Sequence, residues 1–309
     1  MLRQTLIYLS RRQALNDFVR KNWLASRFSR RFVAGDTLDT AIAAVRELNA
    51  KGITATLDLL GESVDRQEDA ETAVNGALAI LDRIAADRPQ ANLSIKLTQL
   101  GFDLDAARFA TNVRRILDKA KGYGIFVRVD MEGTKHTQRT LDLFEKELHP
   151  AYGDGVGIVI QSYLRRTEAD ITRLNASKVK VRLCKGAYLE PASLAFQDKR
   201  EISAHYIADA KLLLQSGAYH GIATHDERII EALKAWVAEQ GIPRERFEFQ
   251  MLYGIRRDLQ QALRADGYNV RVYVPFGTYW YPYFMRRLAE SPSTLFFIPM
   301  SVLKEGFGK

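Results

Sequence analysis

The sequence predicts an α/β fold of the (βα)₈ type, a TIM-like barrel with a helical extension at its N-terminus. From about Gly52 onward, short apolar runs alternate with helix-like stretches, which favours parallel strands joined by crossover helices. Eight such units over about 240 residues match the usual size of a closed barrel. A hydrogen-bonding or charged residue stands at the end of each run, which is where a barrel of this type carries its chemistry.

The expected strands are short and mostly apolar, and each is followed by a helix-like stretch. Those stretches include residues 69–86 after the first strand and residues 280–289 after the last. An open, doubly wound sheet is the structural alternative, but no G-x-G-x-x-G motif follows any run, which argues against it. The eight expected strands are Ile53–Leu59, Leu93–Leu97, Phe126–Asp130, Gly157–Gln161, Val179–Cys184, Gly221–Thr224, Phe247–Met251 and Val270–Val274.

We expect one barrel domain over residues 51–309 and an N-terminal helical arm over residues 1–50. The first 31 residues carry a net charge of +7, within a total of +8 for the chain. A solvated helix face, an anionic membrane surface and nucleic acid are the alternatives for such a basic segment. Nucleic acid is not expected, because the charge is confined to the arm and no aromatic stripe lies on a strand.

Composition restricts the class of protein. The chain has 309 residues, of which 47% are hydrophobic and 27% charged, and it has no apolar run of 18 residues, so we expect no membrane-spanning helix. One cysteine, Cys184, excludes an intramolecular disulfide and suits a reducing cytosol. The five histidines lack metal-ligand spacing, so no metal is expected. We expect a cytoplasmic protein. Whether the arm docks on the inner face of the cell membrane or covers the barrel stays open.

Polar residues at the strand ends form a candidate ring around the barrel mouth. Lys96 lies in an apolar strand, so its ammonium needs a partner, and Asp130 ends the neighbouring strand. We therefore expect a Lys96–Asp130 ion pair. The alternatives are a lysine that extends to the rim and a Schiff-base lysine of an aldolase, at Lys96 or Lys185. The ring comprises Asp58, Lys96, Asp130, Glu132, Gln161, Arg182, Lys185, Thr224, His225, Asp226, Gln250 and Tyr273.

Two further segments carry groups that suit an anionic or electron-rich ligand. Residues 182–188 leave a strand with Arg182 and Lys185 beside a glycine, a sensible cradle for a phosphate or an electron-rich ring. Residues 273–290 hold an aromatic cluster followed by Arg286 and Arg287 on the expected last helix. A pair of guanidinium groups suits a carboxylate, provided that this helix crosses the barrel mouth. A solvated basic helix side is the alternative.

Together these segments resemble the proline dehydrogenase family, in its short bacterial branch with a single function. The similarity is collinear over about residues 30–300 and rests on the blocks as a set. Cys184 is a departure, because an aliphatic residue is more usual there in the family. The blocks are Leu57–Glu62, Ser94–Leu100, Arg128–Glu132, Gln161–Leu164, Arg182–Tyr188, Ala223–Asp226, Phe247–Gly254 and Trp280–Glu290.

The resemblance implies a function, a cofactor and a set of roles. It implies oxidation of L-proline to Δ1-pyrroline-5-carboxylate with noncovalent FAD, electrons passing to a membrane quinone, and a pyrroline-5-carboxylate dehydrogenase as a separate protein. It implies that Lys96, Arg286 and Arg287 hold the substrate carboxylate and that Asp130 orients Lys96. The implied ring-enclosing residues are Ala187, Leu252, Tyr273 and Tyr283. The implied cofactor residues are Gln161, Arg182, Lys185, Gly186, Ala187, Thr224, His225 and Glu290.

Overall fold

The computed structural model of the protein describes residues 31–61 and 63–290, and the side chains of these residues except 286–290. The basic arm up to residue 30 and the residues after 290 lie outside the described part. The boundary between arm and barrel at residue 50 therefore stays a prediction.

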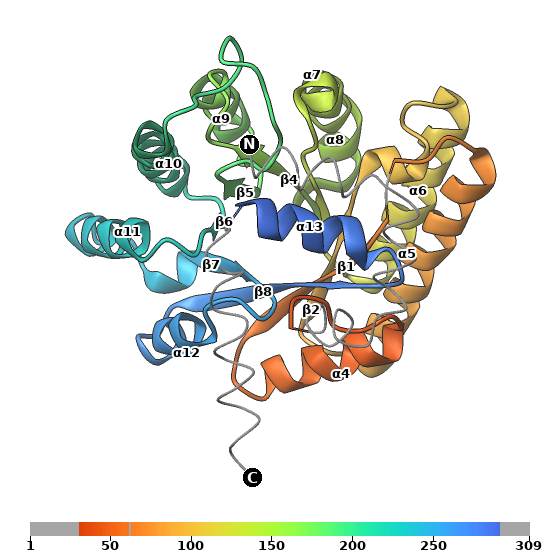
Figure 1. Ribbon diagram of the computed structural model, residues 1–309, viewed down its shortest axis with the longest axis horizontal. Coiled ribbons are helices and arrows are strands. Elements are labelled where there is room, and N and C mark those ends of the chain that lie inside the picture. The colour runs from red at the N-terminus through yellow and green to blue at the C-terminus, as the bar shows by residue number, and fades with distance from the viewer. Residues whose placement is uncertain (1–30, 62, 291–309) are drawn as a thin grey trace.

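Eight parallel strands close into a barrel in chain order, so the expected (βα)₈ fold is confirmed (Figure 1). β8 pairs with β1 over six residues and completes the closure. Each expected strand is present within a few residues of its predicted bounds. The strands are β1 Thr54–Leu59, β2 Ala91–Ile95, β3 Val127–Val129, β4 Val156–Gln161, β5 Val181–Cys184, β6 His220–Ala223, β7 Phe247–Leu252 and β8 Asn269–Phe276.

The strands are apolar because the helices cover their outer sides while other side chains fill the barrel. α6 shows how a covering helix is built: Asp105 caps its N-terminus, Gly124 ends it in the left-handed conformation, and an apolar stripe from Phe109 to Ala120 faces the core. The longer helices are α4 Leu38–Asn49, α5 Gln67–Asp87, α6 Ala106–Tyr123, α7 Thr134–Leu143, α9 Thr167–Ala176, α10 Lys199–Leu214, α11 Glu227–Glu239, α12 Arg257–Ala265 and α13 Trp280–Glu290. The short elements are η1 Leu97–Leu100, η2 Phe144–Leu148, α8 His149–Tyr152, η3 Gly153–Gly155 and η4 Arg244–Arg246.

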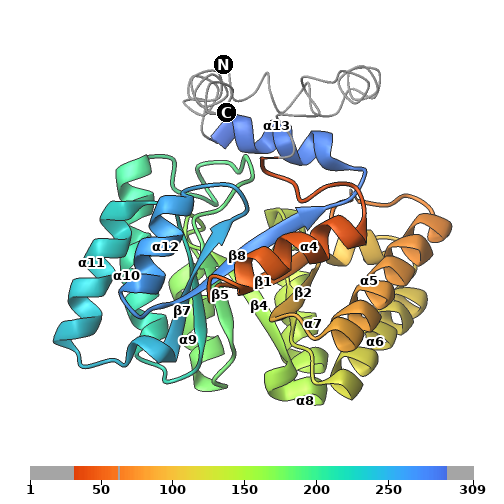
Figure 2. The ribbon, with the colours of Figure 1, turned by 90° about the horizontal axis from the view of Figure 1, so that it is seen from below.

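The last helix does not join the outer ring. α13 follows β8 directly and lies across the carboxyl end of the barrel, as the carboxylate-clamp interpretation requires (Figure 2). Its aromatic side, with Trp280 and Phe284, packs against Phe32, Val33 and Leu60. α4 packs against β1 and β8 on the outer wall instead, where the eighth helix of a regular barrel would lie.

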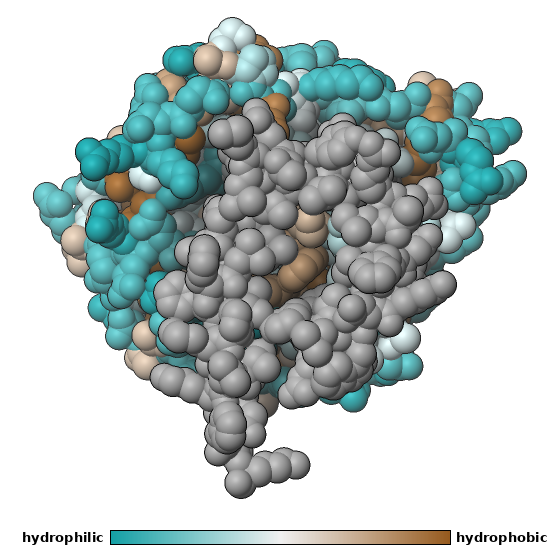
Figure 3. All heavy atoms as spheres, viewed as in Figure 1, coloured by the Kyte–Doolittle hydropathy of each residue, from teal (hydrophilic) through white to brown (hydrophobic). Residues whose placement is uncertain are grey.

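The described surface around the mouth is mostly polar. Figure 3, viewed from the same side as Figure 1, shows hydrophilic residues over most of the described rim. Every helix of the described residues is too short or too polar to cross a membrane.

Candidate active site

Lys96 is held by two carboxylates at the barrel mouth. It follows the last residue of β2 rather than lying inside the strand, and its Nζ atom is 2.6 Å from Asp58 Oδ1 and 3.8 Å from Asp130 Oδ2. The expected Lys96–Asp130 ion pair is therefore present, but the hydrogen bond of Lys96 goes to Asp58. Sequence reasoning placed Asp58 in the ring without assigning it this partner. The available signal was an acidic residue in an apolar strand, which needs a cation nearby.

Asp130 joins four strands through its carboxylate. Its Oδ1 atom accepts from Ser94 Oγ at 2.6 Å and from Arg182 Nη1 at 2.8 Å. Its Oδ2 atom accepts from the Tyr273 hydroxyl at 2.7 Å, and that hydroxyl is 3.4 Å from Lys96 Nζ. Substrate-side residues predicted from the sequence, Lys96, Asp130 and Tyr273, thus form one connected cluster.

The cluster has a defined charge state. Burial alone would lower the pKa of Lys96, but the carboxylates of Asp58 and Asp130 outweigh it and raise that pKa above its ordinary value. Burial, with the Asp130 charge beside it, raises the pKa of Tyr273 well above its ordinary value. At neutral pH the site therefore presents an ammonium and a neutral hydroxyl. A Schiff-base lysine requires a neutral amine, so this geometry disfavours the aldolase alternative at Lys96.

Arg182 contacts Asp130 in this cluster and is itself one of the residues expected to bind the cofactor. Arg182 is the second residue of β5, and its guanidinium is buried, donates from Nε to Gln250 Oε1 at 2.6 Å, and lies 5.2 Å from the centroid of the Tyr273 ring. The Nη2 atom is buried and has no hydrogen-bond partner among the described residues. A buried guanidinium nitrogen without a partner is costly, so this atom is available to an acceptor on a ligand.

The other expected cofactor residues lie at the ends of β4, β5 and β6. Gln161 donates from Nε2 to the Glu132 carbonyl at 2.9 Å, and Lys185 Nζ donates to Asp226 Oδ2 at 2.9 Å. The Thr224 hydroxyl, which is also buried at this end, accepts from the Asp226 amide at 3.1 Å. Asp226 thus links Lys185 after β5 to Thr224 after β6, while Gln161 links the end of β4 to the segment after β3.

The His225 side chain forms a hydrogen bond with the backbone of a neighbouring strand. Its Nε2 atom accepts a hydrogen bond from the amide of Leu252, at 2.8 Å. Because Leu252 ends β7, this bond fixes the position of an expected substrate-side residue from the cofactor side.

Gly186 occupies a conformation that requires glycine. Its φ is +111°, and a Cβ atom there would lie 2.2 Å from the Tyr163 ring. The backbone of the turn between β5 and α10, which continues into Ala187, is therefore pressed against Tyr163.

The expected carboxylate clamp is only partly described. Tyr283 is buried on α13 above the mouth. Arg286, Arg287 and Glu290 belong to the same helix, but their side chains lie outside the described residues, so their roles stay predictions.

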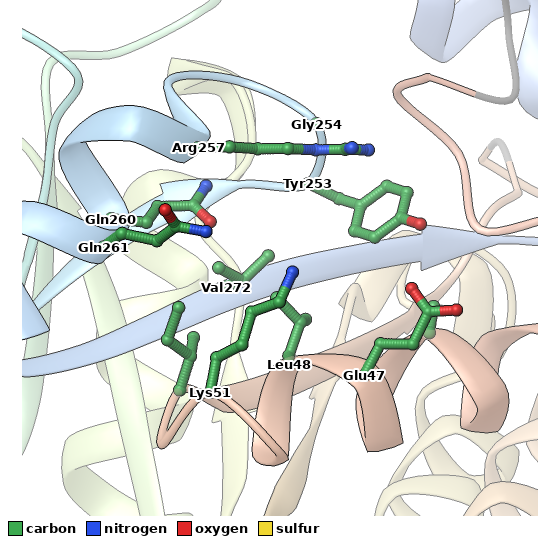
Figure 4. A pocket seen from close by; sticks show the side chains of 11 residues that line it. Glu47, Leu48, Lys51, Tyr253, Gly254, Arg257, Gln260, Gln261 and Val272 are labelled. Atoms are coloured by element: carbon green, nitrogen blue, oxygen red, sulfur yellow. The ribbon is translucent and has the colours of Figure 1, made fainter. Parts of the chain in front are cut away.

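Other features of the described residues do not compete with this site. No group of three His, Cys, Asp or Glu residues within residues 31–61 and 63–290 is arranged to hold a metal ion. An open pocket of about 50 Å³ lies on the outer wall between α4 and α12, where it is lined by Glu47, Lys51, Tyr253 and Arg257 among others (Figure 4). None of the predicted site residues lines it, so we do not place the chemistry there.

Comparison with known proteins identifies the family. A model of the family described as proline dehydrogenase matches residues 41–298. The chain belongs to the proline dehydrogenase family. The expected enzyme class, an oxidoreductase of the proline dehydrogenase type, is thereby confirmed.

Its full-length relatives are single-function bacterial proteins, as expected. The chain is 42% identical over 305 residues to proline dehydrogenase 1 of Bacillus subtilis subsp. natto, covering 99% of this chain and all of the relative. It is 40% identical over 308 residues to the proline dehydrogenase of Deinococcus radiodurans, covering 98% of each chain.

A solved structure agrees on the proline dehydrogenase fold. Proline utilization A from Bdellovibrio bacteriovorus, inactivated by N-propargylglycine, matches with a TM-score of 0.80 and 26% identity over 85% of this chain. The matched region is 32% of that longer chain, so this chain spans about a third of its length.

Proposed function

We propose that this proline dehydrogenase oxidises L-proline to Δ1-pyrroline-5-carboxylate with noncovalently bound FAD and passes the electrons to a membrane quinone. The observation that carries the proposal is the partly buried cluster of Lys96, Asp58, Asp130, Tyr273 and Arg182 at the carboxyl end of the barrel, in a chain of this family.

The substrate has one anionic handle and an apolar ring. Lys96 supplies a fixed positive charge for the carboxylate of proline, and we propose that Arg286 and Arg287 complete the clamp. Tyr273 and Tyr283 offer ring faces, and Leu252 and Ala187 offer apolar contacts around the pyrrolidine. Orientation of the C5–H bond is the contribution expected from these residues, because proximity supplies much of the rate enhancement.

The donor set on the other side of the mouth suits FAD. When bound there, the flavin would accept the hydride from C5 of proline. Arg182 offers a buried Nη2 donor that has no hydrogen-bond partner among the described residues, and Gly186 packs the neighbouring turn against Tyr163. Gln161, Lys185, Thr224, His225 and Glu290 are the further residues that we assign to FAD. We assign no base to the amine proton, which leaves to solvent.

The proposal extends to partners and location. We propose that a separate pyrroline-5-carboxylate dehydrogenase consumes the product, that nucleic acid is not a ligand, and that the enzyme acts in the cytoplasm, at the inner face of the membrane where quinone is reached. The basic arm, proposed as residues 1–50 beside the barrel of 51–309, is the candidate contact with anionic lipid.

An absorption spectrum tests the function directly. The purified protein should show flavin bands, release one FAD per chain on denaturation, and lose its colour when L-proline is added without oxygen. A quinone analogue should restore the colour. N-propargylglycine, the inactivator of the Bdellovibrio protein, should inactivate this enzyme, and proline should protect it. A colourless protein that FAD cannot reconstitute, or a flavoprotein that proline leaves coloured, would overturn the proposal.

A further inference from the structure

The polar cluster continues from Arg182 into the interior of the barrel. Gln250 Oε1 accepts from Arg182 Nε at 2.6 Å, and Gln250 Nε2 donates to Glu248 Oε1 at 2.5 Å. Glu248 Oε1 also accepts from Arg271 Nε at 2.7 Å. Gln250 and Glu248 are 4% and 3% exposed, so these two side chains are closed to water.

We infer that Gln250 is a positioning residue, which holds Arg182 in place for the reaction, and that Glu248 and Arg271 determine which way the Gln250 amide faces. The inference rests on the proposed function for the role of Arg182 toward FAD. Its geometry rests on described contacts alone.

The orientation of the amide follows from its two neighbours. The oxygen of Gln250 faces a guanidinium, which can only donate, and its nitrogen faces a carboxylate that Arg271 keeps ionised. Burial alone would raise the pKa of Glu248, but Arg271 and the hydrogen bonds around it hold that pKa below its ordinary value. A reversed amide would set donor against donor and acceptor against acceptor in a buried site, so one orientation is strongly preferred.

The neighbouring strand leaves room for this amide. Gly221 on β6 pairs with Glu248, and a Cβ atom at Gly221 would lie 2.3 Å from Gln250 Nε2 and 2.7 Å from its Cδ. φ of Gly221 is not in the left-handed region, so space rather than backbone conformation is what an alanine there would violate.

Because the Gln250 amide is neutral, it adds no negative charge beside the Arg182 guanidinium. Arg182 already shares the carboxylate of Asp130 with Lys96 and Tyr273. Gln250 fixes Nε without adding a second negative charge, and Nη2 remains available. The guanidinium can therefore act on an electron-rich or anionic group at the mouth.

The test is hydrogen exchange of the Arg182 Nε–H, followed by NMR in the full-length purified protein with labelled arginine and assigned with Arg182→Lys. Gln250→Met keeps the chain length of the side chain and removes both polar atoms, so exchange should become at least about tenfold faster. Gly221→Ala should change exchange in the same direction.

A matched control separates positioning from stability. Asn112 is also a buried amide and donates to the Leu100 carbonyl at 3.1 Å, but it lies on α6 outside the barrel. Asn112→Leu should lower the unfolding temperature to a similar extent and leave both Arg182 exchange and proline turnover unchanged.

Activity completes the test. In the flavin-loaded enzyme, Gln250→Met should lower kcat about ten- to hundredfold with a smaller change in the KM for proline, and should lower the midpoint potential of the bound flavin. Unchanged exchange in Gln250→Met overturns the inference. Faster exchange with unchanged kcat and potential also overturns it. A wild-type protein that binds no flavin instead removes the proposed function, while the exchange measurement still decides whether Gln250 holds Arg182.

Discussion

Lys96 is a cation because two carboxylates face it. The closer one, Asp58, is 2% exposed and lies 38 residues away in the sequence, on the neighbouring strand. A buried ammonium without such partners is strongly disfavoured. Asp58 therefore keeps Lys96 both charged and oriented for an anionic substrate.

Asp58→Asn should weaken catalysis through Lys96. Loss of one partner of a buried charge pair costs about 2 kcal/mol or more, so kcat/KM for proline should fall roughly 30-fold or further. Because the Asp58 carboxylate raises the pKa of Lys96, that pKa should fall in the variant, and kcat/KM should begin to decline at a lower pH than in wild type. Steady-state kinetics across the alkaline range measure both effects.

Asp82→Asn is the matched control for Asp58→Asn. Asp82 pairs with Lys119 at the same distance of 2.6 Å, but its side chain is half exposed on the outer wall. Surface pairs contribute little, so proline kinetics should stay as in wild type. If Asp58→Asn also retains wild-type kcat/KM at all pH values, then Lys96 does not depend on Asp58.

At the scale of elements, the turn after β5 connects the two sides of the mouth. Gly186 packs on Tyr163, and Glu190 further along accepts hydrogen bonds from the amide and hydroxyl of Thr134 at the start of α7. The turn therefore has two fixed points, one at Tyr163 just after β4 and one at the N-terminus of α7.

Gly186→Ala should disturb flavin binding more than folding. The new methyl group would overlap the Tyr163 ring, and φ of +111° is strained for alanine, so the turn that carries Lys185 and Ala187 must move. We expect the dissociation constant for FAD to rise roughly 5- to 150-fold, since a strain of roughly 1–3 kcal/mol is introduced. Titration of apoprotein with FAD measures it.

Gly122→Ala provides the comparison for the turn variant. Gly122 lies in α6, where nothing approaches an added Cβ within 4 Å. Alanine there should stabilise the helix slightly and leave FAD affinity unchanged. Equal FAD affinity in both variants would show that the Gly186 turn does not form the cofactor site.

Two helices, α4 and α13, lie in places that differ from those of a regular barrel. α13 covers the mouth rather than the wall, and its aromatic side packs on residues before β1 and on Leu60 after it. α4 packs on β1 and β8 in the place of α13, so helices still cover the outer wall of the barrel although the helix after β8 lies over the mouth.

At the scale of the whole molecule, folding buries the carboxyl group of Asp209. Asp209 on α10 is 4% exposed, and its Oδ2 atom has no hydrogen-bond partner among the described residues. Burial, with a smaller effect of the Glu168 charge, raises the pKa of Asp209 to about 7 from 3.8. The folded protein therefore holds a proton that the unfolded chain releases between these pH values.

Stability should accordingly depend on pH through Asp209. The favourable contribution of the protonated group is complete below the unfolded pKa of 3.8 and is lost as the pH rises through about 7. A shift of this size corresponds to about 4 kcal/mol at most. Asp209→Asn should thus gain stability over wild type increasingly from acidic pH to neutral, with a constant gain above it. Denaturant unfolding at several pH values measures the difference.

Glu201→Gln serves as the control for Asp209→Asn on the same helix. Glu201 is exposed in the first turn of α10, so its variant should differ from wild type by nearly the same small amount at every pH. A stability difference for Asp209→Asn that does not change with pH would contradict a buried, protonated carboxyl group.

The sequence by itself determined the strands, their order of appearance and the polar residue at each strand end. These features are local: an apolar run of about six residues and its flanking polar residue are decided by near neighbours and by burial of both sheet faces. The sequence segments that resemble the proline dehydrogenase family also predicted the enzyme class. The sequence also predicted an ion pair for Lys96, because an ammonium in an apolar run needs a partner, with a rim lysine and a Schiff-base lysine as the alternatives.

Only the tertiary structure decided which polar groups meet. Lys96 donates its hydrogen bond to Asp58 rather than to Asp130, and Arg182 donates to Gln250. Both contacts exist because closure of the barrel sets the register between strands that are far apart in the sequence. The place of α13 over the mouth likewise depends on Phe32 and Leu60, which no periodicity within α13 reveals. Register and docking are summed over many distant contacts, so no single segment of sequence specifies them.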